Sequence, residues 1–591
     1  MKDFFKYMAA TVAGLFVFAI ITAVFGVMSI VGMIASESSA KDVSDNTVLV
    51  LNLSGELQER VEENFMSQLT GGSAAGTIGL DDIISAIKKA KANDKIKGIY
   101  IEAGMFAADS YASLQAMRDA LADFKKSGKW IVAYGDIYTQ STYYLASVAD
   151  RVLLNPSGQI DWHGLASQPI FYKDLMAKFG VKMQLAKVGT YKSMPEMYTA
   201  DKMSDANREQ VSAYINGIWN TVCKDVSKSR KISVADLNRY ADSLITFNAA
   251  GDYLKMRLVD KLVYTDGIKT EINKLLKQDA DDDINKIGIA GMKSVKGVKH
   301  DGEQIAVYYA YGSIVDNAAQ GVLGGSHNIV SKEVCDDLKD LMDDDDVKAV
   351  VLRINSGGGS AYASEQIWHY VEMLKKKKPV VVSMGGMAAS GGYYISSGAN
   401  WIVAEPTTLT GSIGIFGMFP DFSGLLTQKL GVKFDEVKTN RHGTFGTMAR
   451  PFNEEEMAYI NKYIERGYSL FRSRVAEGRK MSIDAVERVA QGHVWTGEDA
   501  LRIKLVDELG GLDAAVAKAA KLAKLGEYYT SAYPGKTDWT EQLMNSVSGG
   551  NYIDSRMRAA FGEYYDPLML MKTINEQNAI QARLPFTLNI K

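Results

Sequence analysis

Apolar runs and amphipathic segments alternate along most of the chain. Residues 47–53, 96–102 and 130–134 are short apolar stretches rich in β-branched and aromatic residues, which predicts buried strands. The segments between them, residues 81–92 and 113–126, carry apolar residues at helical spacing. Strands that alternate with helices in this way predict right-handed βαβ units and a mainly parallel sheet, so we expect an α/β fold.

The longest apolar stretch lies near the N-terminus. Residues 7–36 contain no charged side chain, and a helix of this length, at about 1.5 Å per residue, exceeds the ~30 Å hydrocarbon core of a bilayer. We therefore expect a single transmembrane anchor that contacts the lipid bilayer through residues 7–36. A cleaved signal peptide is the alternative, but its apolar region is normally shorter, and Ser-Ser-Ala before Lys41 is only a weak cleavage signal.

The charges around this stretch predict its orientation. Lys2 and Lys6 precede it, which favours a cytoplasmic N-terminus and places the chain after Glu37 on the other side of the membrane. Residues 1–46 are thus predicted to form the cytoplasmic N-terminus, the anchor and a short linker.

The pattern of the first half recurs in the second. Ile96-Lys-Gly-Ile-Tyr-Ile matches Val347-Lys-Ala-Val-Val-Leu, and later matches keep the same offset of about 250 residues, which indicates a tandem duplication. We place the two copies at residues 47–303 and 304–591, the second with a C-terminal extension. An acidic, lysine-rich junction covers residues 277–304, in which residues 287–292 are predicted to be the last strand of the first copy.

Ser390 lies in a run of small residues that follows an apolar strand. The sequence around it, Met-Ala-Ala-Ser-Gly-Gly-Tyr-Tyr, is typical of a strand-to-helix turn that presents a nucleophile. Small neighbours let a peptide approach closely, and the free N–H groups of a helix N-terminus stabilise a developing oxyanion. The alternative is a small-residue turn that only packs a strand against a helix.

The two copies differ at this position and at one other. The first copy has Gln140 opposite Ser390, whereas Lys192 of the first copy faces Gly446 of the second. Each copy has thus kept one half of a Ser–Lys pair. A solvated surface lysine would have no reason to be lost where the serine is kept, so we predict that the two residues act together.

A lysine can serve as a base only when it is uncharged. Burial in apolar surroundings disfavours the ammonium form and lowers the pKa of a lysine. The segment around Lys192, Tyr-Lys-Ser-Met-Pro-Glu-Met, is apolar enough for such an environment. We therefore predict that Lys192 is the general base that takes the hydroxyl proton of Ser390.

Two further segments of the second copy fit an acyl-transfer site. Residues 354–360, Ile-Asn-Ser-Gly-Gly-Gly-Ser, follow a buried strand and can direct backbone N–H groups toward an anion, so with the N–H of Gly391 they would form an oxyanion hole. In residues 409–417, Leu-Thr-Gly-Ser-Ile-Gly-Ile-Phe-Gly, the hydroxyl of Ser412 either orients the Lys192 amine or caps a turn.

Composition narrows the range of partners. The formal net charge is −3 and no basic stripe stands out, so no nucleic-acid partner is expected. The six histidines show no paired spacing and the two cysteines no CxxC, and neither glycine pattern of a nucleotide site occurs; we expect no metal and no other cofactor. Cys223 and Cys335 are expected to be buried, free side chains.

Taken together, the motifs resemble those of the SppA (protease IV) family of signal peptide peptidases, in its long, duplicated, membrane-anchored bacterial form. The resemblance covers nearly the whole chain. It implies a Clp-protease/crotonase-like fold for each repeat, with Ser390 as nucleophile, Lys192 as general base and Ser412 as the residue that assists the lysine. One departure is Gly357, which replaces the usual proline and loosens the loop that carries the implied oxyanion donors Gly358 and Gly359.

The resemblance also implies a homotetramer in the inner (cytoplasmic) membrane, with the catalytic domains on the periplasmic side. We expect a membrane-anchored serine endopeptidase with a Ser-Lys dyad that degrades cleaved signal peptides and similar extended hydrophobic peptides. A catalytically silent membrane scaffold and a crotonase-like acyl-CoA enzyme are the alternatives. The sequence leaves open whether Lys192 meets Ser390 of its own chain or of a neighbour.

Overall fold

The computed structural model describes residues 42–61, 76–295, 302–317, 327–536 and 580–583. The predicted anchor over residues 7–36 lies outside these ranges. None of the helices inside them combines the length and the apolar character that a bilayer crossing requires.

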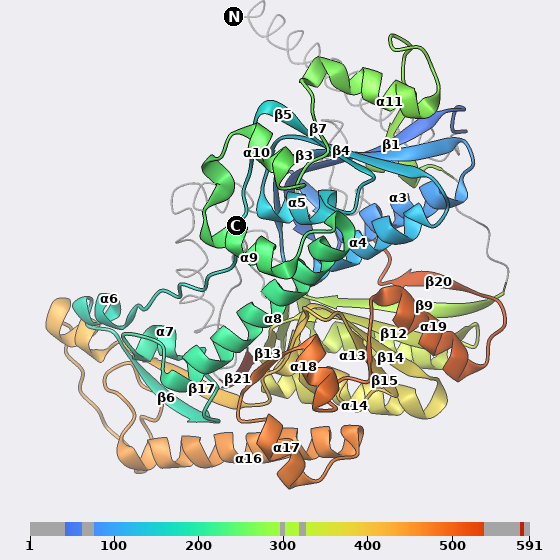
Figure 1. Cartoon of the computed structure of the whole chain (residues 1–591). Helices are drawn as coiled ribbons and strands as arrows, with labels where there is room; N and C mark the ends of the chain where they lie inside the picture. Colours follow the sequence, from blue (N-terminus) through green and yellow to red (C-terminus); the bar gives the residue numbers. More distant parts are fainter. Residues whose placement is uncertain (1–41, 62–75, 296–301, 318–326, 537–579, 584–591) are drawn as a thin grey trace, which may run out of the picture.

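The first copy is built on a parallel sheet with the strand order β8-β1-β3-β4-β5-β7 (Figure 1). The strands are β1 (Thr47–Gln58), β3 (Ile96–Ala108), β4 (Trp130–Tyr138), β5 (Arg151–Ile160), β7 (Lys261–Leu262) and β8 (Lys286–Gly288), and β2 (Thr77–Gly79) pairs with the end of β1. Most side chains on the central strands are buried, because helices cover both faces of the sheet.

The second copy repeats this order as β20-β9-β12-β14-β15-β19, again with all pairs parallel. Its strands are β9 (Glu303–Tyr311), β12 (Val347–Ser356), β14 (Val380–Ala389), β15 (Trp401–Ala404), β19 (Glu508–Leu509) and β20 (Tyr528–Tyr533). The end of β14 also pairs with β16 (Leu409–Gly411), which pairs antiparallel with β18 (Val494–Thr496).

The helices correspond in the same way. The matching pairs are α3 (Leu80–Ala92) and α13 (Ser331–Asp343), α4 (Tyr111–Lys125) and α14 (Ala361–Lys377), α5 (Gln140–Ala146) and α15 (Gly391–Ser396), α8 (Asp205–Arg230) and α16 (Glu454–Arg479), α9 (Val234–Asp242) and α17 (Ile483–Val489), α10 (Ala250–Lys255) and α18 (Gly497–Arg502), and α11 (Ile268–Leu276) and α19 (Leu512–Ala523). Even the two long helices, α8 and α16, have 26 residues each and end at a left-handed lysine. The predicted duplication is therefore present element by element.

The prediction of a strand over residues 287–292 was only partly right. β8 ends at Gly288, and α12 (Ile289–Lys293) follows. The short helix lies beside α3, where the carbonyl oxygen of Met292 accepts a hydrogen bond from Lys89 Nζ at 3.0 Å. Cys223 and Cys335 are buried and free, as predicted.

A third sheet joins the two copies. β6 (Lys182–Val188) of the first copy pairs antiparallel with β17 (Ile415–Asp421) of the second, along the whole length of both strands. The order of this sheet is β11-β10-β13-β21-β17-β6, and its other strands are β10 (Ser313–Val315), β11 (Asn328–Val330), β13 (Gly358–Ser360) and β21 (Ile580–Arg583). α8 runs from the first copy down to the second (Figure 1). Residues 191–197, which contain Lys192 and follow β6, therefore lie against the second copy; we call them the lysine segment.

Candidate active site

Lys192 of the first copy reaches Ser390 of the second copy within the same chain. Its Nζ atom lies 2.7 Å from Ser390 Oγ. The same Nζ atom lies 3.0 Å from Ser412 Oγ and 3.2 Å from the carbonyl oxygen of Ser412. All three residues are fully buried. The structure thus brings together the three side chains that the sequence had singled out.

The backbone at Ser390 is held in a strained turn. Ser390 follows the last residue of β14 and caps α15, with φ 56° and ψ −114°, a region that residues with a side chain seldom adopt. Its N–H donates to the carbonyl oxygen of Gly411 at 2.8 Å. At the next position a Cβ on Gly391 would lie 2.7 Å from Ser364 Oγ, so any larger residue there would force its neighbours to move. The turn fixes the direction of the Ser390 hydroxyl.

The lysine segment is fixed from two sides. Tyr191 N–H donates to the carbonyl oxygen of Gln491 at 2.8 Å. Gly492 has φ +78°, and a Cβ on it would lie 2.6 Å from Lys192 N, so only glycine allows this approach. On the other side, Gln210 of α8 donates from Nε2 to the carbonyl oxygen of Tyr191 at 3.0 Å. These contacts position the backbone of Lys192 before its side chain reaches the serines.

The environment of Lys192 favours the neutral amine. Burial lowers the pKa of Lys192 well below its ordinary value, because the ammonium ion would lose its hydration. A neutral amine has one lone pair and two hydrogens. When the two oxygens of Ser412 accept those hydrogens, the lone pair is left to face the Ser390 hydroxyl, which is the arrangement that proton transfer from serine requires.

Ser412 itself is held by the second copy. It has φ 48°, and its N–H donates to the carbonyl oxygen of His493 at 2.7 Å. Both its hydroxyl and its carbonyl therefore point toward Lys192. Of the two interpretations that the sequence left open for Ser412, this geometry favours contact with the lysine.

Three glycines lie together beside Ser390. A Cβ on Gly391 would be 3.2 Å from both Gly358 Cα and Gly359 N. Gly358 has φ +101°, and its N–H donates to Ser356 Oγ at 3.1 Å. Gly358 would therefore have to leave this bond in order to serve an oxyanion. The assignment of Gly358, Gly359 and Gly391 as oxyanion donors stays a prediction.

Comparison with known proteins agrees with this architecture. The model of peptidase family S49 matches residues 123–279 and 372–526, one segment in each copy. The chain belongs to peptidase family S49. A Clp protease model also matches residues 303–403, which include β9, β12 and β14, so the S49 repeats have a Clp-protease-like α/β fold.

Two relatives of this S49 chain match most of its length, and a third matches a shorter part. It is 36% identical to Protease 4 of Salmonella typhi over 90% of this chain and 87% of the relative. It is 30% identical to the chloroplastic serine protease SPPA of Arabidopsis thaliana over 82% of this chain and 70% of the relative. A putative signal peptide peptidase SppA of Enterococcus faecium is 35% identical over 38% of this chain and 67% of the relative. The protein is a serine peptidase.

The residues that replace Ser390 in the first copy and Lys192 in the second have different surroundings. Gln140, which stands where the second copy has Ser390, accepts hydrogen bonds from the backbone N–H groups of His163 and Gly164 at 3.1 and 3.0 Å. Gly446, which stands where the first copy has Lys192, lies in a segment where an added Cβ would meet no atom within 4 Å. Neither position supports catalysis in its own copy.

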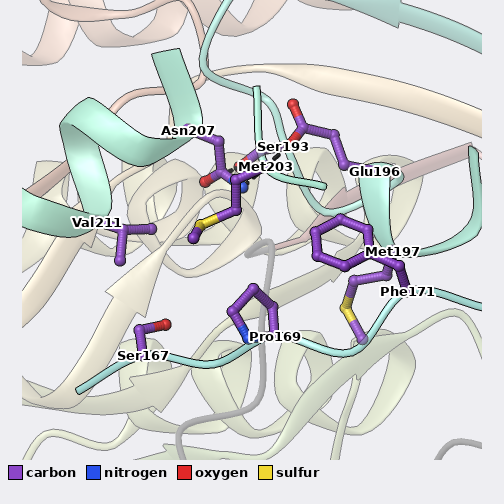
Figure 2. A pocket seen from close by; sticks show the side chains of 9 residues that line it. All are labelled: Ser167, Pro169, Phe171, Ser193, Glu196, Met197, Met203, Asn207 and Val211. Carbon is purple, nitrogen blue, oxygen red and sulfur yellow. Dashed lines mark hydrogen bonds between the residues drawn. The ribbon is translucent and has the colours of Figure 1, made fainter. Parts of the chain in front are cut away.

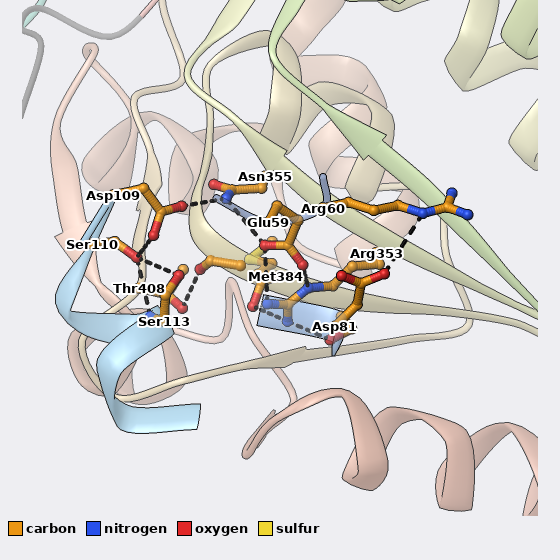
Figure 3. A network of polar contacts seen from close by, with 12 residues as sticks. Glu59, Arg60, Asp81, Asp109, Ser110, Ser113, Arg353, Asn355, Met384 and Thr408 are labelled. Atoms are coloured by element: carbon orange, nitrogen blue, oxygen red, sulfur yellow. Dashed lines mark hydrogen bonds and ion pairs between the residues drawn. The ribbon is translucent and has the colours of Figure 1, made fainter. Parts of the chain in front are cut away.

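A buried polar network connects the first copy to the strands that lead into the site (Figure 3). Glu59 forms a buried ion pair with Arg353 of β12, with 2.6 Å between Oε1 and Nε. Arg353 also donates to Ser383 Oγ and to the carbonyl oxygen of Met384 on β14, at 3.1 and 3.2 Å. The ion pair and the bonds of Arg353 therefore link the residue that follows β1 to both central strands of the second sheet.

Asn355 extends this network toward Ser390. Its Nδ2 donates to Glu59 Oε2 at 3.1 Å and to Asp109 Oδ2 at 2.9 Å, and its Oδ1 accepts from the N–H of Met387 at 3.1 Å (Figure 3). Burial, followed by the nearby charge of Glu59, raises the pKa of Asp109 to about 6. These contacts leave no local signature in the sequence. Asn355 lies inside the glycine-rich motif, but its two partners are 296 and 246 residues away along the chain.

A pocket opens beside the lysine segment of this S49 peptidase (Figure 2). Its apolar lining comes from Pro169, Phe171, Met197, Met203 and Val211. Its polar lining comes from Ser167, Ser193, Glu196 and Asn207, and the last two are joined by a hydrogen bond of 3.0 Å. The pocket thus reaches Ser193, the residue after Lys192, and has an apolar part in its lining.

Proposed function

We propose that this protein is a membrane-anchored serine endopeptidase in which Ser390 is the nucleophile and Lys192 the general base. The observation that carries the proposal is the distance of 2.7 Å between Lys192 Nζ and Ser390 Oγ, in a buried site that favours the neutral amine. A surface lysine beside a serine would be charged and would not accept the proton.

The steps follow from this geometry. Ser390 Oγ attacks the scissile carbonyl carbon while its proton passes to Lys192 Nζ. Backbone N–H groups near Gly391 stabilise the oxyanion, and Lys192 then gives the proton to the leaving amine as the C–N bond breaks. Lys192 next takes a proton from a water molecule whose oxygen attacks the acyl carbon, and returns that proton to Ser390 Oγ as the ester bond breaks. Ser412 keeps the amine aligned throughout.

The substrate class that fits is an extended peptide with apolar side chains. The pocket beside Ser193 presents two methionines and a phenylalanine, and flexible Met side chains adapt to apolar groups of different shape (Figure 2). The name of the Enterococcus faecium relative, a putative signal peptide peptidase, agrees with this class. We therefore propose cleaved signal peptides and similar hydrophobic peptides as substrates.

The proposed location follows from the sequence of residues 7–36 and the lysines before it. The anchor would hold the peptidase in the inner membrane, with the two copies on the periplasmic side. Carbonate extraction of membranes should leave the full chain in the pellet and release a variant that begins at residue 42. Release of the full chain would contradict the anchor.

A homotetramer is the proposed assembly. Apolar side chains are exposed on the segment of the second copy that corresponds to the lysine segment: Leu430, Val432, Phe434, Val437, Phe445 and Met448. The first copy packs its own counterpart onto the second copy, whereas in the described part of the chain these side chains remain uncovered. We propose that a neighbouring chain covers them. Such a contact is head-to-tail and can close into a ring, and the family resemblance implies that the ring has four chains.

Light scattering on the detergent-solubilised chain tests the assembly. We expect a tetramer for the wild type and smaller species for Val437→Glu. Phe247→Glu, at another exposed apolar position, should leave the tetramer intact. A wild-type monomer at micromolar concentration would contradict the ring.

Peptide hydrolysis tests the catalytic proposal. Wild type should cleave an internally quenched hydrophobic peptide, and Ser390→Ala and Lys192→Met should each lose activity by at least about 10²-fold, the usual contribution of a positioned base. Lys182→Ala, at an exposed lysine of β6, is the matched control and should retain activity. Full activity of Lys192→Met would overturn the Ser-Lys dyad. An inactive wild type would favour the alternative of a catalytically silent membrane scaffold.

A further inference from the structure

A buried side-chain amide lies between the lysine segment and the backbone of the second copy that holds the two serines. It belongs to Gln210 of α8, and the whole residue is fully buried. α8 extends between the two copies (Figure 1), and Gln210 lies near its N-terminal end. One end of the amide is a donor and the other an acceptor, so Gln210 can bond to both copies at once.

The nitrogen end of the amide contacts the lysine segment. Gln210 Nε2 lies 3.0 Å from the carbonyl oxygen of Tyr191 and 2.9 Å from Ser193 Oγ. These two residues flank Lys192 in the sequence. Nε2 also lies 3.1 Å from Asn207 Oδ1, which accepts a hydrogen bond from Ser193 Oγ at 2.8 Å (Figure 2). The amide hydrogens are thus directed at acceptors on both sides of the proposed base.

The oxygen end of the amide contacts the second copy. It accepts a hydrogen bond from the N–H of Val494 in β18 at 3.1 Å. Val494 pairs with Gly411 of β16, whose carbonyl oxygen accepts the N–H of Ser390. The residue before Val494 is His493, whose carbonyl oxygen accepts the N–H of Ser412. The amide therefore bonds to the same stretch of backbone that holds both serines.

The duplicated helix has a different residue at this position. The sixth residue of α8 is Gln210, and the sixth residue of α16 is Tyr459. The side chain of Tyr459 is 59% exposed, whereas Gln210 is buried. The second copy has also lost the counterpart of Lys192. The amide is thus present in the copy that carries the proposed base.

The burial of these hydrogen bonds makes the arrangement specific. A buried donor or acceptor that loses its partner costs more free energy than an exposed one, because no water replaces the partner. The lysine segment and β18 are therefore held in one relative position while the amide is present. Its hydrogen bonds reach the neighbours of the reacting residues, so Gln210 acts on the reaction through them.

We propose that Gln210 is a positioning residue, which keeps the Lys192 amine aligned with Ser390 and Ser412 across the two copies. The proposal rests on the function proposed above, because it concerns the alignment of the Ser-Lys dyad. Without the amide, the lysine segment would loosen from β18 and water would reach the lysine. The loss should therefore change both the rate and the protonation of the base.

Gln210→Met in the full chain tests the proposal, because methionine has a similar length and neither amide group. We expect kcat to fall at least about tenfold, since small displacements of reacting groups are costly. The pH at which kcat/KM levels off should rise by about one unit, because hydration favours the ammonium form of Lys192. A role in stability alone would lower the urea midpoint and leave this pH unchanged.

Thr221→Val is the matched control on the same helix. It removes a buried hydroxyl that donates to the carbonyl oxygen of Gly217 within α8. This variant should keep the kcat and the pH profile of wild type. Wild-type kcat and pH profile in Gln210→Met would overturn the proposal, as would equal changes in Thr221→Val.

Gln210→Glu is a second variant that keeps the test decisive if the methionine variant does not fold. The carboxylate keeps an oxygen for the N–H of Val494 but loses both amide hydrogens. Its negative charge also favours the ammonium form of Lys192, so kcat/KM should level off at a higher pH than in wild type. An unchanged kcat and pH profile in this variant would contradict the positioning role.

These measurements separate the inference from the proposed function. If Lys192→Met is inactive while both Gln210 variants keep the kcat and the pH profile of wild type, the dyad is supported and the role of Gln210 is wrong. If Lys192→Met keeps full activity, the proposed function fails, and the positioning role fails with it.

Discussion

Lys192 Nζ lies 2.7 Å from Ser390 Oγ although 198 residues separate them along the chain. Each residue belongs to a different copy of the duplicated domain, and each copy has lost the partner. The pair forms because β6 of the first copy joins the sheet of the second through β17, so that the segment after β6 lies over the turn at Ser390. The candidate site is thus divided between the two copies, and neither copy contains both residues.

The pH dependence of activity should report the burial of Lys192. Because burial lowers its pKa well below the ordinary 10.5, kcat/KM should rise with pH and level off well below pH 10.5. An activity that rises until the pH reaches the ordinary lysine range would show a solvated base and contradict this environment.

The free energy of unfolding should also rise with pH because of Lys192. Between the lowered pKa of Lys192 and 10.5 the unfolded chain binds one proton more than the folded chain, so the free energy of unfolding rises with pH in this window. Lys192→Met lacks the titrating group. The difference in urea midpoint between wild type and Lys192→Met should therefore shift in favour of wild type as the pH is raised, and a constant difference would argue against a buried amine.

Removal of the Ser412 hydroxyl should slow catalysis without weakening binding. Ser412→Ala deletes one of the two acceptors of the Lys192 amine and leaves a buried donor underused, which costs about 1–3 kcal/mol, or roughly a 5- to 150-fold loss in kcat. KM should change little, because Ser412 is buried and contacts the Lys192 amine. Steady-state kinetics would contradict this role if KM rose while kcat stayed constant.

Gly492 should be as important for activity as the residues that react. Gly492→Ala places a Cβ 2.6 Å from Lys192 N at a positive φ, so the lysine segment must move. A displacement of about 1 Å at the reacting groups can cost about 10²-fold in rate. Gly526→Ala, where a Cβ meets no atom within 4 Å, is the control. Equal kcat values for the two variants would refute the close packing of the lysine segment.

The ion pair between Glu59 and Arg353 should matter mainly for stability. Glu59→Ala leaves a fully buried guanidinium without its carboxylate, which typically costs about 3–5 kcal/mol in the free energy of unfolding. The double variant Glu59→Met with Arg353→Met should lose less than the single variant, because no charge stays buried. Urea denaturation of both would contradict this account if the double variant were the less stable.

The sequence was most informative at the positions where the two copies could be compared. The α/β class, the duplication and the pair formed by Ser390 and Lys192 followed from the repeated pattern and from what each copy had lost. Strand ends were less predictable: β3 continues to Ala108, past the predicted residue 102, because its parallel neighbour β1 also continues. Local patterns do not reveal how far such pairing extends.

Contacts between distant segments could not be predicted. Asn355 binds Glu59 and Asp109 of the other copy, and Gly492 approaches Lys192 from about 300 residues away, and neither contact leaves a local signature. The pairing of β21 with two strands is of the same kind. Such contacts depend on how the copies dock, which the spacing of residues within one copy does not fix.

The most direct test of the divided site is the rate at which a fluorophosphonate labels Ser390, with the labelled peptide identified by mass spectrometry. Wild type and Lys192→Met differ only at residue 192 and share the turn at Ser390, the glycines and Ser412. We predict labelling of Ser390 in wild type that accelerates as pH rises and falls by at least about 10²-fold in Lys192→Met. Equal labelling rates in the two proteins, or a label on another serine, would contradict the account.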